Sequence, residues 1–554
     1  MTEPATDPLE LLRIAVIDAA EQLAGDGVDG RSTITLERPK RAQFGDYSTN
    51  AALLLAPRTG VPPRELAERL GDALQATLGS SLERFEVAGP GFLNLFVSDR
   101  WLTVALAHAL EAGERFGVGA LERRERVLVE FVSANPTGPM HVGHARNAAY
   151  GDALARMLAL QGHDVKREFY VNDAGTQVRK LGESIRAIAR GEPVPEDGYK
   201  GDYVVELAAE LTDAASMDAA QAGRAAVTMM VEHIRGSLAA FGVEGFDIWF
   251  YESALHEGDP SPVAHTLAIL EQQGHTYRSE GALWLRTTDF GDDKDRVLVR
   301  SSGEHTYFAS DIAYHQDKRE RGFQRQIDVW GADHHGYVQR MKAAYEALGG
   351  DADELELLIM QLVHLVSSGE RAQMSKRAGE FVSLEELVAE IGVDAARWYL
   401  LARSHDTTVD LDLDLAREQS NENPVYYVQY AHARIASVLA KAGEERVRAA
   451  AAELGAADGP LHPSERALVE ALLAFPAELA EAAQRRAPHR IAAYALSLAQ
   501  TFTAFYRDCQ VVGVEQEQGG GRSVESLRIA LCVLSARAIA RCLGLLGVSA
   551  PERM

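Results

Sequence analysis

Cysteine is scarce in this chain. Only Cys509, Cys532 and Cys542 occur, all near the C-terminal end, and no two of them form a C-x-x-C pair. A disulfide framework needs several paired cysteines, and a cysteine-type zinc site needs closely spaced ones. The sequence therefore argues against both and predicts a protein of a reduced compartment.

Positive charge is also in deficit. The chain has 56 Lys and Arg residues against 81 Asp and Glu residues, a formal net charge of −25. This balance excludes the general basic surface of histone-like nucleic-acid binders, although a local basic stripe on an acidic protein can still hold RNA. On charge alone, a metabolic enzyme is the favoured class.

Long apolar runs and a targeting pattern are missing as well. The first residues, MTEPATDPLELLRIAVIDAAEQL, are acidic where a signal peptide is basic. No window approaches the run of about 18 uninterrupted apolar residues that a membrane span needs. We therefore expect a cytoplasmic protein with no membrane partner.

Length and composition predict a globular chain of several domains. With 554 residues, of which 46% are hydrophobic and 25% charged, the chain is too long for a single core. Roughly the first 115 residues have the pattern of a small α/β unit. This unit has an amphipathic helix around Leu11–Leu23, a candidate helix cap at Asp46 or Ser48, and a turn at Gly89–Gly91 between two β-rich runs.

At Val127 the pattern changes to that of a parallel α/β sheet. VLVEFVSAN predicts a buried strand, HVGHARNAAYGDALARMLALQG a long helix, and VKREFYVND the next strand, which together form one crossover. Residues from about 180 to 290 favour helix and end in the strand pair ALWLRT and RVLVRS, as expected of an insertion between two half-folds. The strand IDVWGADHHG follows, and from about Asp394 only helices are expected.

The segment His141-Val142-Gly143-His144 lies at the start of the predicted helix, just after a buried strand. Helix N-termini hold free N–H groups and partial positive charge, which suit phosphate. Two imidazoles there can donate hydrogen bonds to a polyphosphate as negative charge builds, and Gly143 lets a nucleotide approach the backbone. The alternative, two polar residues that only cap a helix, is weaker because strand and helix flank the motif in the expected order.

A second candidate phosphate contact lies in a basic loop further along the chain. The loop Gln373–Gly379 has the sequence QMSKRAG and contains Lys376. A lysine on a mobile loop can close over pyrophosphate and neutralise it in the transition state without acting as a nucleophile. Alone, such a loop is more often ordinary surface, but its pairing with H-x-G-H makes it specific.

Together, H-x-G-H and M-S-K resemble the two signature motifs of class I aminoacyl-tRNA synthetases. The resemblance implies a Rossmann-like α/β catalytic domain in which His141, His144 and Lys376 are catalytic. The loop departs from the family's K-M-S-K-S at Gln373 and Arg377, which leaves Lys376 as the pyrophosphate contact. The ATP contacts implied by the two motifs are His141, Gly143, His144, Met374, Ser375 and Lys376.

The strand-end segment Gly331–His335, with the sequence GADHH, resembles the part of class I enzymes that holds the ribose and adenine side of ATP. The carboxyl end of a strand is where open α/β sheets bind nucleotides. The resemblance assigns further ATP contacts to Gly331 and Asp333. The alternative is a metal site, but no cysteine partner and no H-E-x-x-H motif accompanies the segment. We expect no protein-bound metal, and Mg²⁺ only as the companion of ATP.

Two segments resemble the arginyl member of the family: EFVSANPTGPMH from Glu130 and YVNDAGTQ from Tyr170. A guanidinium is a planar fork that pairs with carboxylates in bidentate geometry, and Tyr307 and Asp311 share one face if YFASDIAYH is helical. Without the resemblance, such a Tyr–Asp pair is more often ordinary surface. The resemblance implies that L-arginine is bound by Glu130, Asn135, His141, Tyr307 and Asp311.

The two ends of the chain resemble the tRNA-binding parts of arginyl-tRNA synthetases. NPVYYVQYAHARI, PHRIA and the final LLGVSAPE resemble the helical anticodon-binding domain, and GPGFLNLF resembles the N-terminal domain that holds the tRNA elbow. Most aromatic residues there have the helical spacing of core residues, and Phe92 is equally a candidate core residue of a sheet. Some of these aromatic residues can instead stack on unpaired bases. The candidate tRNA contacts are Phe92, Asn94, Tyr426, Tyr430, Arg485, Arg486 and Arg490.

We therefore predict an elbow-binding domain at 1–115, a catalytic domain at 116–405 with a helical insertion at about 185–300, and an anticodon-binding domain at 406–554. The resemblance implies an arginine–tRNA ligase that forms arginyl-adenylate from arginine and ATP and transfers arginine to the terminal adenosine of tRNA(Arg). It also implies that activation needs bound tRNA. We expect a monomer. Two alternatives stay open: a small-molecule nucleotidyltransferase and a tRNA-binding protein that has lost catalysis.

Overall fold

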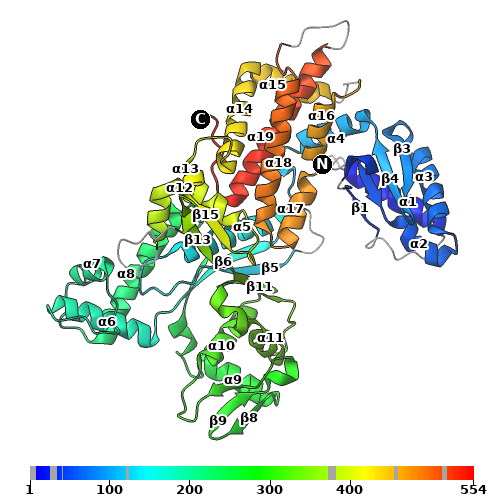
Figure 1. Ribbon diagram of the computed structural model, residues 1–554. Helices are drawn as coiled ribbons and strands as arrows, with labels where there is room; N and C mark the ends of the chain where they lie inside the picture. The colour runs from blue at the N-terminus through cyan, green and yellow to red at the C-terminus, as the bar shows by residue number, and fades with distance from the viewer. Residues whose placement is uncertain are drawn as a thin grey trace.

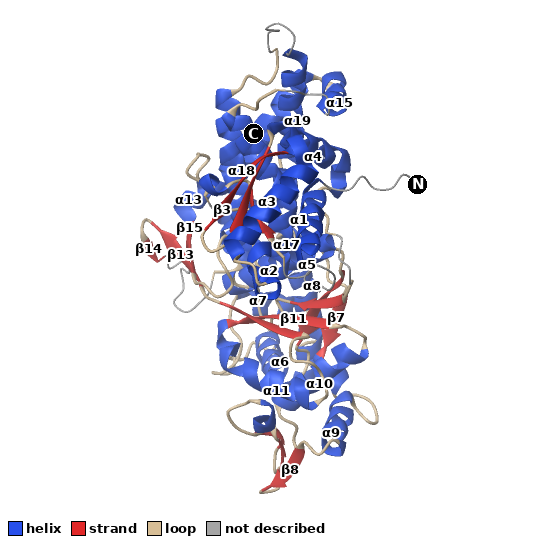
Figure 2. Cartoon of the chain, turned by 90° about the vertical axis from the view of Figure 1, so that its right-hand side faces the viewer, coloured by secondary structure: helices blue, strands red, loops and turns tan. Residues whose placement is uncertain are grey.

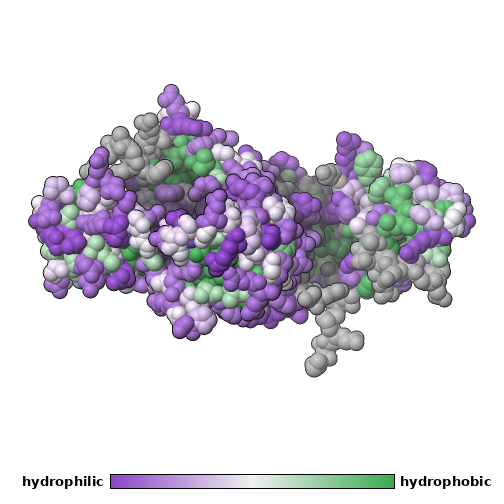
Figure 3. All heavy atoms as spheres, turned by 90° about the horizontal axis from the view of Figure 1, so that it is seen from below, coloured by the Kyte–Doolittle hydropathy of each residue, from purple (hydrophilic) through white to green (hydrophobic). Residues whose placement is uncertain are grey.

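The computed structural model describes residues 8–24, 34–39, 41–119, 124–371, 382–454, 459–513 and 521–554. The chain forms an elongated body with an N-terminal unit beside it (Figure 1). When the molecule is turned by 90°, a sheet crosses its middle, most helices lie above this sheet, and a small sheet lies at the lower end (Figure 2). Seen from that end, the surface is mainly hydrophilic and the N-terminal unit forms a separate lobe (Figure 3).

An antiparallel sheet of order β1-β2-β4-β3 and four helices form the N-terminal unit. Strands β3 and β4 form the hairpin whose turn the sequence predicted. Gly91 in this turn has a φ of 147°, and a Cβ there would lie 2.7 Å from the Cβ of Pro63, so the close approach requires glycine. The elements are α1 (Pro8–Ala24), β1 (Leu36–Glu37), β2 (Tyr47–Thr49), α2 (Ala51–Thr59), α3 (Pro63–Leu78), β3 (Leu82–Ala88), β4 (Phe92–Val97) and α4 (Asp99–Ala112).

A five-stranded parallel sheet of order β12-β11-β5-β6-β7 forms the middle of the molecule. Helix α5 connects β5 to β6, as predicted, and is buried along most of its length. The chain places β6 on one side of β5 and β11 on the other, and ligands bind at such a reversal of strand order. The elements are β5 (Arg126–Glu130), α5 (Val142–Gln161), β6 (Asp164–Val171), β7 (Ile248–Tyr251), β11 (Arg325–Gly331) and β12 (Leu355–Met360).

The insertion predicted at about 185–300 is in fact two separate segments, because β7 lies inside that range and joins the central sheet. Helices α6 to α8 before it form a core of their own. The sheet β10-β9-β8 after it contains the predicted strand pair. The run IWFY of β7 is too short for periodicity to separate strand from helix. The elements are α6 (Gly175–Ala189), α7 (Asp202–Glu210), α8 (Ala219–Ala240), α9 (Pro262–Gln272), β8 (Thr276–Ser279), β9 (Ala282–Leu285), β10 (Arg296–Val299) and α10 (Tyr307–Glu320).

A strand also follows Asp394, where the sequence predicted only helices. Strand β15 pairs in parallel with β13, and β14 completes this small sheet. Val409 and Leu411 are buried by this pairing with a distant segment, which the local pattern VDLD does not reveal. The elements of this region are α11 (Val338–Ala347), β13 (Val363–Ser367), β14 (Glu370–Arg371), α12 (Leu384–Leu401) and β15 (Val409–Asp412).

Helices form the C-terminal region and pack around the long helix α19 (Figure 1). Within the described ranges, one segment, Val524–Leu546 of α19, is long and apolar enough to cross a membrane, but most of it is buried against neighbouring helices as in a core helix. The elements are α13 (Leu413–Arg417), α14 (Pro424–Ala442), α15 (Glu444–Glu453), α16 (Pro463–Leu473), α17 (Phe475–Gln484), α18 (Pro488–Asp508) and α19 (Gly521–Leu546).

Ion pairs join the N-terminal unit to the C-terminal helices. Arg466 on α16 lies 2.8 Å from Asp46 and 2.6 Å from Asp99. Asp46, a candidate helix cap in the sequence, is therefore part of this joint, and Asn50 occupies the N-cap position of α2 because β2 continues past Ser48.

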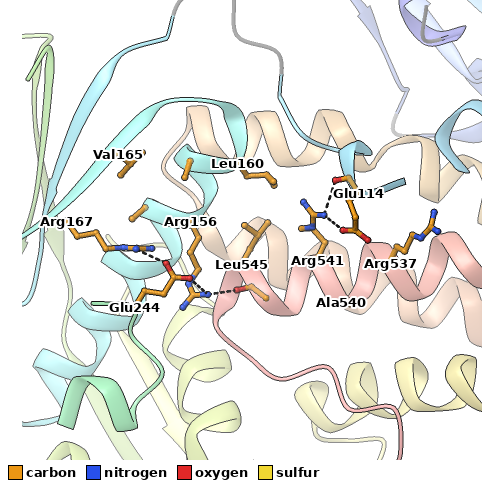
Figure 4. Close-up of a pocket in the computed structure, with 13 residues that line it drawn as sticks. Glu114, Arg156, Leu160, Val165, Arg167, Glu244, Arg537, Ala540, Arg541 and Leu545 are labelled. Carbon is orange, nitrogen blue, oxygen red and sulfur yellow. Dashed lines mark hydrogen bonds and ion pairs between the residues drawn. The ribbon is translucent and has the colours of Figure 1, made fainter. Parts of the chain in front are cut away.

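A cavity of about 610 Å³ lies where α5, α19 and the end of the N-terminal unit meet (Figure 4). Its arginines are held by the protein itself: Arg156 and Arg167 share Glu244, at 3.1 and 2.7 Å, and Arg541 pairs with Glu114 at 2.7 Å. The cavity borders the C-terminal end of α5, about 20 Å along the helix from H-x-G-H. It is a junction between domains rather than part of the catalytic site.

Candidate active site

The H-x-G-H segment begins helix α5 beyond the carboxyl end of β5. The Nδ1 of His141 accepts a hydrogen bond from the N–H of Gly143 at 3.1 Å, and the Nδ1 of His144 accepts one from the N–H of His141 at 3.3 Å. The ring centroids lie 3.8 Å apart. Because Nδ1 accepts in both rings, each Nε2 carries the proton and can donate it to a phosphate oxygen.

Both imidazoles are neutral near pH 7. Burial lowers the pKa of His141, and burial together with the neighbouring His141 lowers the pKa of His144 to about 4. The two rings therefore offer hydrogen-bond donors rather than cations to an anion, and the N-terminus of α5 adds partial positive charge. The sequence indicated the donors, and their charge state follows from the burial that the fold imposes.

The M-S-K loop lies outside the described residues, but the segment that follows it is bound to H-x-G-H. The N–H of Val142 donates to the carbonyl of Val382 at 3.1 Å. His141 and Ser383 form an isolated antiparallel bridge. The chain that leaves the loop is thereby held at the start of α5. The loop's predicted phosphate contacts stay predictions: Met374, Ser375 and Lys376.

The predicted adenosine side of the site follows β11. Strand β11 ends at Gly331, and a 3₁₀ helix, η6 (Ala332–Tyr337), comes next. The carboxylate of Asp333 lies 3.5 Å from His334 and is 82% exposed, so a ribose hydroxyl has access to it. A Cβ at Gly331 would lie 2.7 Å from Oδ1 of Asp333, so a side chain there would displace this carboxylate. In the part of the chain that the structure describes, no three His, Cys, Asp or Glu residues are placed to hold a metal ion.

Two carboxylates lie close together beside this site. Asp311 is on α10, four residues after Tyr307, and accepts a hydrogen bond from the hydroxyl of Tyr337. Glu252 is the first residue of the 3₁₀ helix η4 (Glu252–Leu255), directly after β7. Burial raises the pKa of Asp311, and burial together with the charge of Asp311 raises the pKa of Glu252 to about 7. Two close carboxylates with raised pKa values form a site that favours a cation.

Glu252 was missed in the sequence because its range was assigned to an insertion. The side-chain amide of Asn172 donates a hydrogen bond to the carboxylate of Glu252 at 3.1 Å. The hydroxyl of Tyr170 forms a second hydrogen bond with Glu252. Asp173 accepts bonds from the N–H and hydroxyl of Ser253, at 2.9 and 2.7 Å. The segment YVND thus positions Glu252. The signal that could have identified Glu252 is its position directly after a strand. That strand, β7, is recognised only through its pairing with β6.

Glu130, the last residue of β5, lies in a buried charge network. Its Oε2 accepts from Lys318 at 2.6 Å and its Oε1 from the hydroxyl of Ser133 at 2.8 Å. Lys318 also donates to Asp328 at 2.8 Å. Both carboxylate oxygens of Glu130 thus have hydrogen-bond partners inside the protein. Through one of these bonds Glu130 holds the side chain of Ser133 in place. A direct contact between Glu130 and arginine stays a prediction.

Asn135 and Tyr307, two further predicted arginine contacts, are both exposed. Asn135 lies in the turn after β5, and Tyr307 is the first residue of α10 with 71% of its surface exposed. An amide and an aromatic ring in these places are open to a ligand, and the ring can lie against a guanidinium plane. Their contacts with arginine remain predictions.

Three family models together match most of the chain: "Arginyl tRNA synthetase N terminal domain" at residues 10–97, "tRNA synthetases class I (R), catalytic domain" at 105–189 and 245–436, and "DALR anticodon binding domain" at 428–554. Arginine–tRNA ligases of Geobacillus thermodenitrificans and Bacillus subtilis are 44% and 43% identical over 94% of this chain and of each relative. The chain belongs to the arginyl-tRNA synthetase family.

Solved structures agree with this membership. Thermus thermophilus arginyl-tRNA synthetase is 25% identical, with a TM-score of 0.76 over 98% of this chain and 100% of that one. The predicted fold class is confirmed: a class I Rossmann-like catalytic domain, an N-terminal α/β domain and a C-terminal helical domain. The match to the catalytic family model omits residues 190–244, which hold α7 and α8.

Of the two predicted RNA-facing tyrosines on α14, Tyr430 is exposed and Tyr426 is half-buried. Tyr426 and Tyr430 stack with 6.1 Å between ring centroids. The guanidinium of Arg434 lies over Tyr430 at 4.7 Å and over Tyr506 at 5.5 Å. Unpaired bases stack on such rings and guanidinium planes. Arg434 was not among the predicted contacts, although its spacing of four residues from Tyr430 was visible in the sequence.

Of the three predicted RNA-facing arginines, Arg486 serves a different purpose. Its Nε and Nη2 both donate to Glu356 of β12 at 2.8 Å, and its side chain is only 14% exposed. It joins the central sheet to the C-terminal helices, so the structure does not bring it to an RNA surface. Arg485 is 67% exposed beside Glu481, and Arg490 is partly exposed beside Glu478.

We expect Arg486→Ala to lower the free energy of unfolding by about 1–2 kcal/mol, because Glu356 loses one charged partner but keeps Arg325. Affinity for tRNA(Arg), measured by filter binding, stays within about twofold. Arg485→Ala is the control for stability alone, because this side chain is 67% exposed and its loss is expected to leave the free energy of unfolding unchanged. A loss of tRNA affinity in Arg486→Ala without a change in stability would restore its predicted RNA contact.

The two predicted elbow contacts differ in exposure. Phe92, the first residue of β4, is 41% exposed and available to a base. Asn94 lies in the middle of β4, between Ser48 of β2 and Glu86 of β3, and is 3% exposed. A direct contact between a tRNA base and Asn94 is therefore not available in this structure.

Proposed function

We propose that this protein is an arginine–tRNA ligase that activates L-arginine with ATP and transfers it to the terminal adenosine of tRNA(Arg). The observation that carries the choice of amino acid is the pair Asp311 and Glu252, two neighbouring carboxylates whose pKa values are both raised by burial, in a member of the arginyl-tRNA synthetase family. A planar guanidinium satisfies both carboxylates, whereas a neutral side chain leaves them uncompensated.

In the first step, the arginine carboxylate attacks the α-phosphorus of ATP in line, and pyrophosphate leaves. Mg²⁺ accompanies ATP as part of the substrate. The neutral imidazoles of His141 and His144 donate their Nε2–H groups to phosphate oxygens, and Lys376 neutralises the departing pyrophosphate. No protein nucleophile takes part, so positioning and electrostatic stabilisation supply the catalysis.

In the second step, a ribose hydroxyl of the terminal adenosine attacks the carbonyl carbon of the adenylate, and AMP leaves. Class I behaviour assigns the 2′-OH to this attack, and family behaviour makes arginine activation depend on bound tRNA. We further propose that residues 1–115 hold the tRNA elbow and 406–554 the anticodon, with Phe92, Tyr426, Tyr430, Arg485 and Arg490 as contacts, in a cytoplasmic monomer.

The raised pKa of Glu252 makes arginine binding dependent on pH. With a pKa of about 7, Glu252 is mostly protonated at pH 6 and mostly ionised at pH 8. Only the ionised carboxylate pairs with the guanidinium, so the Kd for arginine falls about tenfold from pH 6 to pH 8. Equilibrium dialysis with radiolabelled arginine measures this change.

The Glu252→Gln variant is the control for this pH dependence. Its Kd is expected to be higher at pH 8 and nearly constant between pH 6 and pH 8. The pKa values of His141, His144 and His256 are lowered, which moves their titration to the acid side of this window. A wild-type Kd that stays flat with pH, or a variant that keeps the full slope, would contradict the role of Glu252.

Charging of tRNA(Arg) with radiolabelled arginine tests the proposed function as a whole. We expect acid-precipitable arginyl-tRNA with ATP present, and no charging with citrulline or lysine at equal concentration. Binding of tRNA without charging would favour a protein that has lost catalysis. Absence of tRNA binding in a filter assay would favour a small-molecule nucleotidyltransferase.

A further inference from the structure

Tyr203 of α7 reaches the turn that separates Asn135 from His141. Its hydroxyl donates to the carbonyl of Thr137 at 2.9 Å, and a Cβ at Gly138 would lie 3.4 Å from the same hydroxyl oxygen. The ring packs against the hydrophobic core of α6 to α8. Burial raises the pKa of Tyr203 to about 12, so the hydroxyl keeps its proton and stays a donor.

The turn that receives this bond follows strained backbone. Val132 and Ser133, just after β5, have φ angles of 69° and 42°, in the left-handed region that is unfavourable for residues other than glycine. Such a conformation persists only where the surroundings hold it. Pro136 and Pro139 within the turn lack an N–H and cannot donate a bond of their own. The N–H of Val132 donates to Oδ1 of Asn147 at 2.6 Å, and the N–H of Thr137 donates to the carbonyl of Asn135 at 2.8 Å. The bond from Tyr203 adds to these and ties the turn to helix α7.

The same helical unit touches the other side of the site. The hydroxyl of Ser237 on α8 donates to Glu385 in the first turn of α12, and His233 lies 3.6 Å from the same carboxylate. Helix α12 starts directly after Ser383, the residue that pairs with His141. Helices α6 to α8 thus contact both the turn after β5 and the segment that follows the M-S-K loop.

We propose that Tyr203 is a positioning residue for the activation step. It touches no reacting atom. Its bond to Thr137 fixes the turn, and the turn sets where Asn135 meets the amino acid and where His141 meets the phosphates. The helical unit α6–α8 is then a brace for the catalytic loops. This inference rests on the proposed function, because the step it affects is arginine activation.

Tyr203→Phe removes only the hydroxyl and keeps the packed ring. We expect kcat/KM for arginine in ATP–pyrophosphate exchange with tRNA present to fall about tenfold, the effect of one lost hydrogen bond at a site sensitive to small displacements. The KM for tRNA stays unchanged. Tyr199→Phe is the matched control, since its ring packs against the same core, and its kcat/KM is expected within about twofold of wild type.

Hydrogen exchange gives a second readout that does not depend on activity. Backbone amides from Val132 to Val142 are expected to exchange faster in Tyr203→Phe than in wild type, and at wild-type rates in Tyr199→Phe. Equal activity losses in both variants would overturn the proposal, because they would indicate general weakening of the helical unit. Faster exchange with unchanged kcat/KM, or no change in either, would overturn it too. A wild-type chain without arginine-dependent activity would refute the proposed function, while hydrogen exchange would still report on the turn.

Discussion

Asp311→Asn is expected to raise the KM for arginine by about 100- to 1000-fold, the usual cost of removing one carboxylate from a close, desolvated charge pair. Asparagine keeps the shape and can still accept the bond from Tyr337, but it has no charge for the guanidinium. Asp311→Ala should show the same loss. Because the charge of Asp311 helps to raise the pKa of Glu252, that pKa should fall in both variants.

Selectivity is the sharper part of this test. With citrulline or lysine as competitor, wild type should be almost unaffected, whereas Asp311→Asn should lose most of its preference for arginine. Glu320→Gln removes one negative charge from the exposed end of the same helix and should leave the KM unchanged. An unchanged arginine KM in Asp311→Asn would refute its assignment.

Lys376→Ala is expected to lower the rate of adenylate formation by about 100- to 1000-fold, as removal of a single charge-stabilising contact in a transition state does. Affinity for tRNA(Arg) should change less than about threefold, because Lys376 is assigned to pyrophosphate and not to RNA. Single-turnover adenylate formation and filter binding measure the two quantities separately.

Arg377→Ala is the matched control for Lys376. It removes the neighbouring positive charge, at a position where the family's motif has serine, and should retain most of the activity. Equal losses of adenylate formation and tRNA affinity in Lys376→Ala would show a general electrostatic effect and would remove its catalytic assignment.

The parts of the site that were predictable depend on local pattern. The H-x-G-H segment follows an apolar strand and opens a helix, and both the strand type and the helix start are visible within a few residues. The pairing of Tyr307 with Asp311 on one helical face is equally local. The fold confirms these placements because the same short segments decide both structure and position.

The missed parts depend on pairing between distant segments. Strand β7 gains its place from β6, and without that pairing Glu252 has no visible link to the site. Exposure is also a tertiary property. Arg486 lies in a cluster of arginines that predicted an RNA contact, yet its guanidinium forms an ion pair with Glu356 of β12. The neutral state of His144 likewise follows from burial, which a motif does not contain.

Arginine-dependent ATP–pyrophosphate exchange, with and without tRNA(Arg), tests the central claim most directly. We predict exchange only when arginine, ATP and tRNA(Arg) are all present. Exchange without tRNA would keep the synthetase assignment and remove the coupling between tRNA and activation. An intact protein that binds ATP and tRNA yet shows no arginine-dependent exchange under either condition would contradict the account.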